Sequence, residues 1–315
     1  MTIRCAVIGV GYLGKFHARK YAALDNAELV GVVDPDSTAG QALAHELGCN
    51  YFPDHQRILD RVDAVSIVAP TTLHHSIAAD CLNSGIHVLL EKPITTTVAE
   101  AEALITIARQ RSLVLQVGHL ERFNPAIMAL GETLSDSLRF IESHRLAPFK
   151  PRATDVNVML DLMIHDIDII LHLVKSDVTD IRASGASVLS DSIDIANARL
   201  EFANGCVANV TASRISQKSE RKMRIFQRDQ YITVDFQEKA LDIYAKGDGE
   251  MFPGIPDITH RHTEGGESDA LLLEIRDFLD AIHHGHDPVV TGEDGKRALD
   301  TAIRISKLVP DTHAL

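Results

Sequence analysis

An aspartate and a histidine on one face of a predicted helix could carry out proton transfer. The apolar spacing over residues 158–174 predicts a helix, and it places Asp161, His165, Asp168 and His172 on a single face. An aspartate one turn before a histidine can fix its tautomer and raise its basicity, which suits general-base catalysis near neutral pH. A solvated polar face would give a similar pattern, although a stripe without Lys, Arg or Glu is unusual. The pattern alone leaves both interpretations open.

A lysine directly after a predicted buried strand is the second candidate. Lys92 follows the apolar stretch 86–90 and precedes Pro93, which stiffens the turn. The carboxyl ends of parallel strands form the crevice in which open α/β sheets bind ligands. We expect an ordered turn, with the bond before Pro93 a candidate for the cis form, and Lys92 aimed at the reacting groups. An ordinary exposed loop lysine is the alternative.

A glycine-rich loop near the start of the chain could position a cofactor for these groups. Gly9, Gly11 and Gly14 have the spacing G-x-G-x-x-G between a predicted strand, 3–8, and a helix. The first glycine permits a sharp turn, the second lets the backbone approach a pyrophosphate, and the third lets the helix pack closely on the strand. The helix N-terminus offers N–H groups and a positive dipole end to phosphates. A loop that only makes a turn would need none of the features that follow it.

The next predicted strand, 27–33, ends in Asp34, twenty residues after Gly14. An acidic residue at this distance accepts hydrogen bonds from ribose hydroxyls. Asp36 follows closely, so a 2′-phosphate would meet two carboxylates. The sequence therefore predicts NAD as the cofactor, favoured over NADP.

The remaining elements predict an α/β protein of two domains. Strands and helices alternate up to residue 117, as in a doubly wound parallel Rossmann sheet, which gives a dinucleotide-binding domain over 1–120. Residues 121–315 predict an α+β domain for substrate binding and oligomerisation, with an open, mostly antiparallel sheet and a last helix that can pack back on the first domain. Asn204-Gly205 predicts a hairpin. The strands expected after residue 175 are 178–188, 195–202, 206–213, 222–227, 231–236 and 241–245.

The composition excludes several classes of partner. The chain of 315 residues has a net charge of −13, which argues against nucleic acid and anionic membranes.

Its four cysteines show no C-x-x-C spacing and are expected to be reduced, packed thiols. The first strand leaves no room for a signal peptide, and no apolar run approaches membrane-spanning length. No recognised metal motif is present. We expect a cytoplasmic protein without a metal.

Together, the glycine loop, Glu91-Lys92-Pro93 and Asp161-x-x-x-His165 resemble the glucose–fructose oxidoreductase and inositol dehydrogenase family over essentially the whole chain. The resemblance implies an NAD-dependent sugar dehydrogenase in which Lys92, His165 and Asp161 flank the carbon that loses a hydride. The cofactor contacts it implies are Gly9, Gly11, Tyr12, Leu13, Gly14, Asp34, Pro70, Thr71, His74, Glu91 and Lys92. Thr71 departs from the family pattern, which commonly has Asn after this proline. It also implies dimers or tetramers paired through the C-terminal sheets.

Three further segments resemble the branch of the family that oxidises the 3-hydroxyl of UDP-N-acetylglucosamine: residues 119–125, 145–149 and 161–166. This resemblance implies a UDP-sugar substrate, a downstream aminotransferase and a place in lipid A biosynthesis. The substrate contacts it implies are Lys92, Arg122, Asn124, Arg145, Asp161, His165 and Arg214. A cyclitol or monosaccharide dehydrogenase of the same family, or an NAD-binding regulator without catalysis, are the alternatives; the retention of all three catalytic candidates argues against the regulator.

Two basic stretches in this acidic chain could bind a diphosphate. Arg145 to Arg152 contains Lys150, and Arg214 to Arg224 contains five cations. Arginine forks suit a diphosphate, whereas basic residues that guard a strand edge would explain the second stretch equally.

Overall fold

The computed structural model describes residues 2–134, 138–149, 157–266 and 268–309. The chain divides into two compact units: residues 1–120 with 269–299, and residues 121–268 with 300–315. The start of α8 therefore belongs to the first unit and its end to the second. Among the described residues, no helix is both long and apolar enough to cross a membrane. All four cysteines are free, as predicted.

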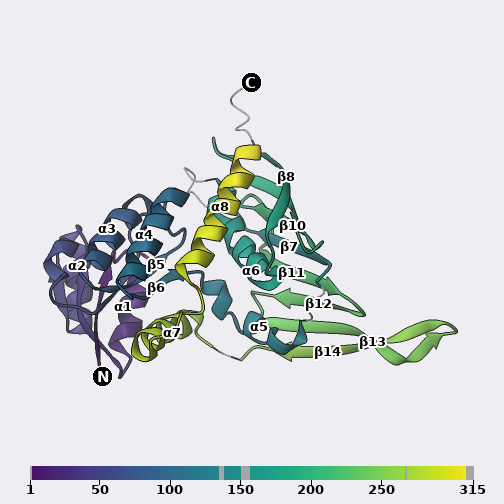
Figure 1. The fold of residues 1–315 in the computed structure, drawn as a ribbon, viewed down its shortest axis with the longest axis horizontal. Helices are drawn as coiled ribbons and strands as arrows, with labels where there is room; N and C mark the ends of the chain where they lie inside the picture. The colour runs from purple at the N-terminus through teal and green to yellow at the C-terminus, as the bar shows by residue number, and fades with distance from the viewer. Residues whose placement is uncertain (1, 135–137, 150–156, 267, 310–315) are drawn as a thin grey trace. The chain divides into compact units, whose positions relative to one another are not determined.

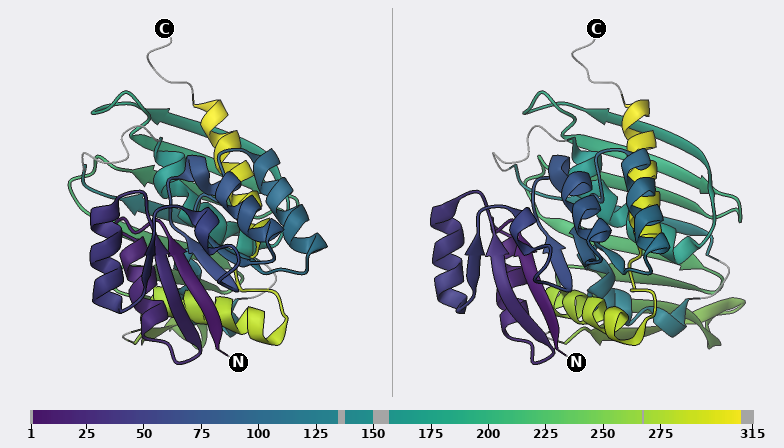
Figure 2. Two further views of the ribbon diagram at one scale, coloured as in Figure 1. Left: turned by 90° about the vertical axis from the view of Figure 1, so that its left-hand side faces the viewer. Right: turned by 60° about the vertical axis from the view of Figure 1, so that its left-hand side comes forward.

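The first unit contains a six-stranded parallel sheet with the order β3-β2-β1-β4-β5-β6 (Figure 1). Helices cover both of its faces, with α1, α2 and α7 on one and α3 and α4 on the other (Figure 2). The bounds are β1 (Ile3–Ile8), α1 (Gly14–Ala22), β2 (Ala27–Val33), α2 (Ser37–Leu47), β3 (Asn50–Phe52), η1 (His55–Ile58), β4 (Ala64–Ile67), α3 (Thr71–Asn83), β5 (His87–Glu91), α4 (Val98–Gln110), β6 (Leu115–Gly118), α7 (Ala270–His284) and α8 (Gly292–Leu308).

The strand order reverses between β1 and β4, which defines the switch point of a doubly wound sheet. The strands are nearly continuous apolar runs because both faces of the sheet are covered: Ala64–Ile67 is buried at every position. One core cluster joins β1 to α1 and α7 through Tyr21 and Phe278, both fully buried. The Rossmann prediction is confirmed, but α7 lies within the residues 121–315 that the sequence analysis gave to the second domain, whereas the structure places it in the first unit.

The second unit contains an eight-stranded sheet with the order β14-β13-β12-β11-β7-β10-β9-β8. All neighbouring strands are antiparallel except β7 and β10. The bounds are η2 (Leu120–Phe123), α5 (Pro125–Met128), η3 (Gly131–Thr133), β7 (Phe140–Leu146), η4 (Met159–Met163), α6 (Ile164–Val174), β8 (Val178–Ala186), β9 (Ile195–Phe202), β10 (Val207–Ser213), β11 (Glu220–Gln227), β12 (Gln230–Asp235), β13 (Ala240–Phe252) and β14 (Ile255–Glu264).

The β13–β14 hairpin corrects the sequence prediction, which ended the last strand at residue 245. β13 continues to Phe252, and β14 returns beside it as a strand that was not predicted (Figure 1). Most side chains beyond Lys246 are exposed, so the hairpin lacks the alternating apolar pattern that reveals a half-buried strand. The hairpin predicted at Asn204-Gly205 does join β9 to β10, and Gly205 has a φ of 83°.

Candidate active site

The glycine loop of the first unit has the geometry that dinucleotide binding requires. Gly9 has a φ of 89°, and a Cβ there would lie 2.7 Å from the Val68 carbonyl oxygen. A Cβ on Gly14 would overlap the Gly9 carbonyl oxygen, whereas one on Gly11 would meet no atom within 4 Å. Gly9 and Gly14 are therefore required by the fold itself. Gly11 has open space beside it, where the backbone can approach a phosphate.

Asp34 follows β2 and is anchored to this loop. Its Oδ2 accepts a hydrogen bond from the Val10 backbone N–H at 2.7 Å, and its Oδ1 accepts one from the Asp36 N–H at 2.8 Å. Tyr12 and Leu13 are exposed, and α1 starts without a side-chain cap. The N-terminus of α1 thus lies next to a fixed carboxylate, and these residues fit a dinucleotide with its phosphates at the helix and its ribose at Asp34.

The loop after β4 carries three more predicted cofactor contacts. Pro70 is exposed and precedes α3, where Thr71 is the first helical residue. His74 is buried, and its ring nitrogens lie 2.9 Å from the carbonyl oxygens of Ala69 and Pro93. Burial lowers the pKa of His74, and the nearby carbonyl groups only partly offset this effect. His74 therefore joins the loop before α3 to the turn after β5.

Lys92 lies at that turn, directly after the carboxyl end of β5. The Lys92–Pro93 peptide bond is cis, one of the two predicted forms. Glu91, the last residue of β5, accepts a hydrogen bond from the Lys92 backbone N–H through Oε2 at 3.1 Å. Lys92 is half-buried, and it thus occupies the strand end at which the sequence predicted chemistry.

The predicted helix over 158–174 of the second unit begins with a wider turn. Residues Met159–Met163 form a π-helical turn, and α6 continues from Ile164. Asp161 lies within the turn and His165 at the start of α6, and both are half-buried. Such turns widen a helix locally and are frequent at functional sites. No sequence signal distinguished this turn from an ordinary helix.

The remaining members of the Asp/His stripe separate. Asp168 is buried, and its carboxylate accepts two hydrogen bonds from Arg122, at 2.7 and 3.1 Å. His172 is exposed. This helix face is therefore mixed. It is neither fully exposed to solvent nor entirely part of one site.

The predicted substrate-binding arginines are buried and hold carboxylates of their own unit. Arg145 on β7 pairs with Asp166 at 2.5 Å and with Glu121 at 2.9 Å. Burial alone would lower the pKa of Arg145, but these two carboxylates hold it above its ordinary value. Arg214 pairs with Asp194 at 2.8 Å and also donates to the hydroxyl groups of Ser190 and Ser192.

Asn124, also predicted to contact substrate, caps α5. Its Oδ1 accepts from the Ala126 N–H at 3.1 Å, and its Nδ2 donates to the Phe236 carbonyl oxygen at 3.0 Å. Lys150 and Arg152 of the first basic stretch lie outside the described residues. In the second stretch, Arg221 remains nearly half exposed, with Glu121 3.8 Å away.

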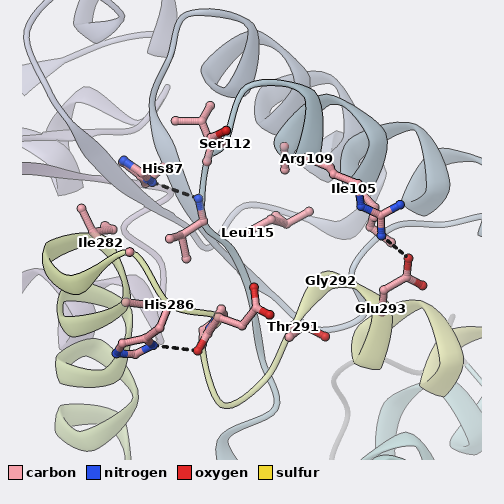
Figure 3. A pocket seen from close by; sticks show the side chains of 17 residues that line it. His87, Ile105, Arg109, Ser112, Leu115, Ile282, His286, Thr291, Gly292 and Glu293 are labelled. Carbon is pink, nitrogen blue, oxygen red and sulfur yellow. Dashed lines mark hydrogen bonds and ion pairs between the residues drawn. The ribbon is translucent and has the colours of Figure 1, made fainter.

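A cavity of about 560 Å³ in the first unit is separate from all of these residues (Figure 3). It lies by the amino-terminal ends of β5 and β6, the opposite edge of the sheet from Lys92. Its polar groups are engaged within the chain: His87 accepts from the Val114 N–H at 2.9 Å, and Arg109 pairs with Glu293 at 3.2 Å. The cavity adds no catalytic group.

Sequence reasoning missed three buried groups beside these candidates. His17 on α1 lies 3.3 Å from Glu91, Asp166 anchors Arg145, and Glu274 on α7 is fully buried. Buried charges need partners, and His17 and Asp166 find theirs in other elements, at Glu91 and Arg145. Two of these groups lay within recognisable patterns: His17, three residues after the glycine triplet, and Asp166, at the end of the segment 161–166.

A Rossmann unit with a glycine loop and an anchored acid, and a second unit with an open sheet, define a dinucleotide-dependent oxidoreductase. The chain belongs to the oxidoreductase family with an NAD-binding Rossmann fold, the Gfo/Idh/MocA family, whose N-terminal domain matches residues 3–119 and whose C-terminal domain matches residues 136–233. This confirms the predicted family, fold and cofactor.

Relatives are similar over almost the whole chain. A UDP-N-acetylglucosamine 3-dehydrogenase of Acidithiobacillus ferrooxidans is 44% identical, with 96% of each chain covered. A crystal structure of that enzyme superimposes with a TM-score of 0.91 and 98% of each chain covered. A scyllo-inositol 2-dehydrogenase (NAD(+)) of Bacillus subtilis is 27% identical and covers 96% of this chain and 92% of its own.

Proposed function

We propose that this protein oxidises the 3-hydroxyl group of UDP-N-acetylglucosamine to a 3-keto group with NAD. The observation that carries the proposal is the 44% identity, over 96% of each chain, to an enzyme of that name. The structure is consistent with it, because Lys92, Asp161 and His165 are all half-buried side chains within reach of solvent rather than core residues.

Each catalytic candidate has a definite part in this mechanism. NAD, when bound at the glycine loop, supplies the hydride acceptor for the carbinol carbon. His165 takes the proton of the hydroxyl group as a general base, and Asp161 orients its ring. Lys92 donates a hydrogen bond to the same oxygen and stabilises the negative charge that develops there. The substrate thus loses one hydride and one proton, and a ketone remains.

The substrate diphosphate needs local positive charge in a chain whose net charge is −13. Arg122, Asn124, Arg145 and Arg214 remain the proposed substrate-side residues, but each already holds a partner in its own unit. Arg221 is the most suitable additional contact, because it lies opposite Arg145 on β11 and is 47% exposed. Burial and then the charge of Arg145 lower the pKa of Arg221, and a phosphate would supply a compensating negative charge.

Steady-state kinetics of variants test these roles. His165→Ala and Lys92→Met should lower kcat by roughly a hundredfold or more while the Kd for NAD changes little, and Asp161→Asn should cost less. Arg221→Ala should raise KM for the UDP-sugar with little change for NAD. Arg182→Ala, an exposed arginine on β8, is the matched control. Wild-type turnover by His165→Ala would place the base elsewhere.

A free cyclitol is the second candidate substrate, because the inositol dehydrogenase from Bacillus subtilis also aligns over nearly the whole chain. A cyclitol carries no diphosphate, so Arg221→Ala would leave its KM unchanged. Oxidation of myo-inositol but not of UDP-N-acetylglucosamine would favour this alternative and leave the dehydrogenase mechanism standing.

The face of the second sheet opposite α6 supports the proposed pairing into dimers or tetramers. Side chains alternate along β7: Ser143 and Arg145 bond to Asp166 of α6, so Phe140 points to the opposite face. A row of ring contacts, stacked from Phe226 onward, follows that face across the strands: Phe140, Phe226, Tyr231, Tyr244 and His260. A second copy of the sheet would cover it.

A cytoplasmic location and an aminotransferase that consumes the keto sugar complete the proposal.

A further inference from the structure

His17 is buried and pairs with the partly buried Glu91, the residue before the catalytic lysine candidate. His17 is 1% exposed, and its Nε2 lies 3.3 Å from Glu91 Oε1. The other oxygen, Oε2, accepts the Lys92 backbone N–H at 3.1 Å. One carboxylate thus connects a side chain of α1 to the backbone of Lys92.

The neighbouring strand leaves room for this carboxylate. Gly118 on β6 is the strand partner of Glu91. A Cβ at Gly118 would lie 3.1 Å from the carboxyl carbon and from Oε2 of Glu91, which is closer than ordinary packing permits. Since the φ of Gly118 is not in the left-handed region, space rather than backbone conformation favours glycine here. The glycine preserves the position of the Glu91 carboxylate.

The electrostatic surroundings keep this group charged. Burial alone would raise the pKa of Glu91, but His17 and Lys92 together hold it below its ordinary value. Glu274 on α7 has the opposite outcome: burial, and then the charge of Glu91, raise its pKa well above the ordinary value. Of these two carboxyl groups, Glu91 is the one whose surroundings favour the charged form, which can hold a donor.

We propose that Glu91 is a positioning residue of the reaction: with His17, it fixes the Lys92 backbone to the helix that follows the glycine loop. The inference rests on the proposed function, in which Lys92 hydrogen-bonds the reacting oxygen. α1 begins at Gly14, at the end of the glycine loop that binds the dinucleotide. Lys92, which acts on the substrate, is therefore attached to the same helix as this loop. His74 holds the Pro93 carbonyl oxygen from α3 in the same way. A displacement of about 1 Å at a reacting group can cost a hundredfold in rate.

Two variants and a matched control test this proposal. Glu91→Gln keeps the size of the side chain and removes its charge, and His17→Gln removes the imidazole ring. Both should lower kcat between roughly tenfold and a hundredfold, with the Kd for NAD and the KM for substrate within about twofold. Asp80→Asn breaks a more exposed histidine–carboxylate pair of the same unit, His55–Asp80 at 2.9 Å, and should leave kcat unchanged. Rates are expressed per NADH-binding site.

A double-mutant cycle distinguishes positioning from a structural role. In a Lys92→Met background, Glu91→Gln should cause no further loss of turnover, because it acts through Lys92. In a His165→Ala background it should cause the full loss again. Equal losses in both backgrounds, or a lowered Tm with normal turnover per site, would overturn the inference. Wild-type turnover by Lys92→Met itself would instead refute the proposed role of the lysine.

Discussion

The first unit holds its candidate site residues mainly through backbone turns and backbone hydrogen bonds, whereas the second holds its residues mainly by buried ion pairs. Gly9, Gly14 and the turn at Lys92 follow directly from local spacing. Arg145 and Asp166, by contrast, are 21 residues apart and both buried. A residue can therefore resemble a surface ligand in the sequence and still be part of a buried scaffold.

We expect the largest loss of stability when one partner of a buried ion pair is removed. Arg145→Ala would leave Asp166 buried without its cation, which should lower the free energy of unfolding by about 3–5 kcal/mol. Arg182→Ala, which breaks an exposed pair with Asp180, should cost at most about 1 kcal/mol. Urea unfolding of both variants measures the difference. Equal losses would mean that the second unit does not depend on its buried pairs.

The glycine loop permits a similar test in the first unit. Gly14→Ala should destabilise the protein by about 3 kcal/mol or more, because the new methyl group would overlap a backbone carbonyl. Gly11→Ala meets no atom, so its Tm should stay near wild type while its Kd for NAD rises at least about tenfold. Calorimetry and titration with NAD separate the two effects. Unchanged NAD affinity in Gly11→Ala would exclude a close approach of the phosphates.

Cofactor selection should show a smaller effect. The Asp34 carboxylate is fixed by two backbone N–H groups, so it cannot turn away from a 2′-phosphate without losing them. We expect NAD to bind at least about tenfold more tightly than NADP. Fluorescence titration with both reduced cofactors measures the ratio. Equal dissociation constants would contradict the assignment of Asp34 to the ribose.

The smallest effect concerns the pH dependence of stability. Burial and the Glu91 charge raise the pKa of Glu274, so the folded protein keeps a proton that the unfolded chain releases above about pH 4. Stability contributed by this group is therefore present at low pH and is lost as the pH rises. Glu274→Gln should gain in Tm over the wild type progressively between pH 5 and pH 8. The exposed Glu28→Gln is the control, and a pH-independent difference for Glu274→Gln would count against a neutral Glu274.

Sequence reasoning anticipated the two-unit fold and the location of Lys92, because alternating apolar runs and a glycine triplet are local signals. It did not anticipate β14, whose exposed residues lack periodicity, nor the π-helical turn that carries Asp161. It also placed Arg145 and Arg214 in a diphosphate site without foreseeing Asp166 and Asp194. The spacing of residues around one charged side chain does not identify its ion-pair partner, so these pairs are found only in the folded structure.

The identity of the substrate is the most direct test of the proposed function. Purified protein is mixed with NAD and, separately, with UDP-N-acetylglucosamine, glucose or myo-inositol, and the absorbance of reduced nicotinamide is followed. We predict that NADH forms with UDP-N-acetylglucosamine and at a far lower rate with either free compound, and that Lys92→Met abolishes most of the signal. NADH formation from myo-inositol or glucose, with none from the nucleotide sugar, would contradict the proposed function.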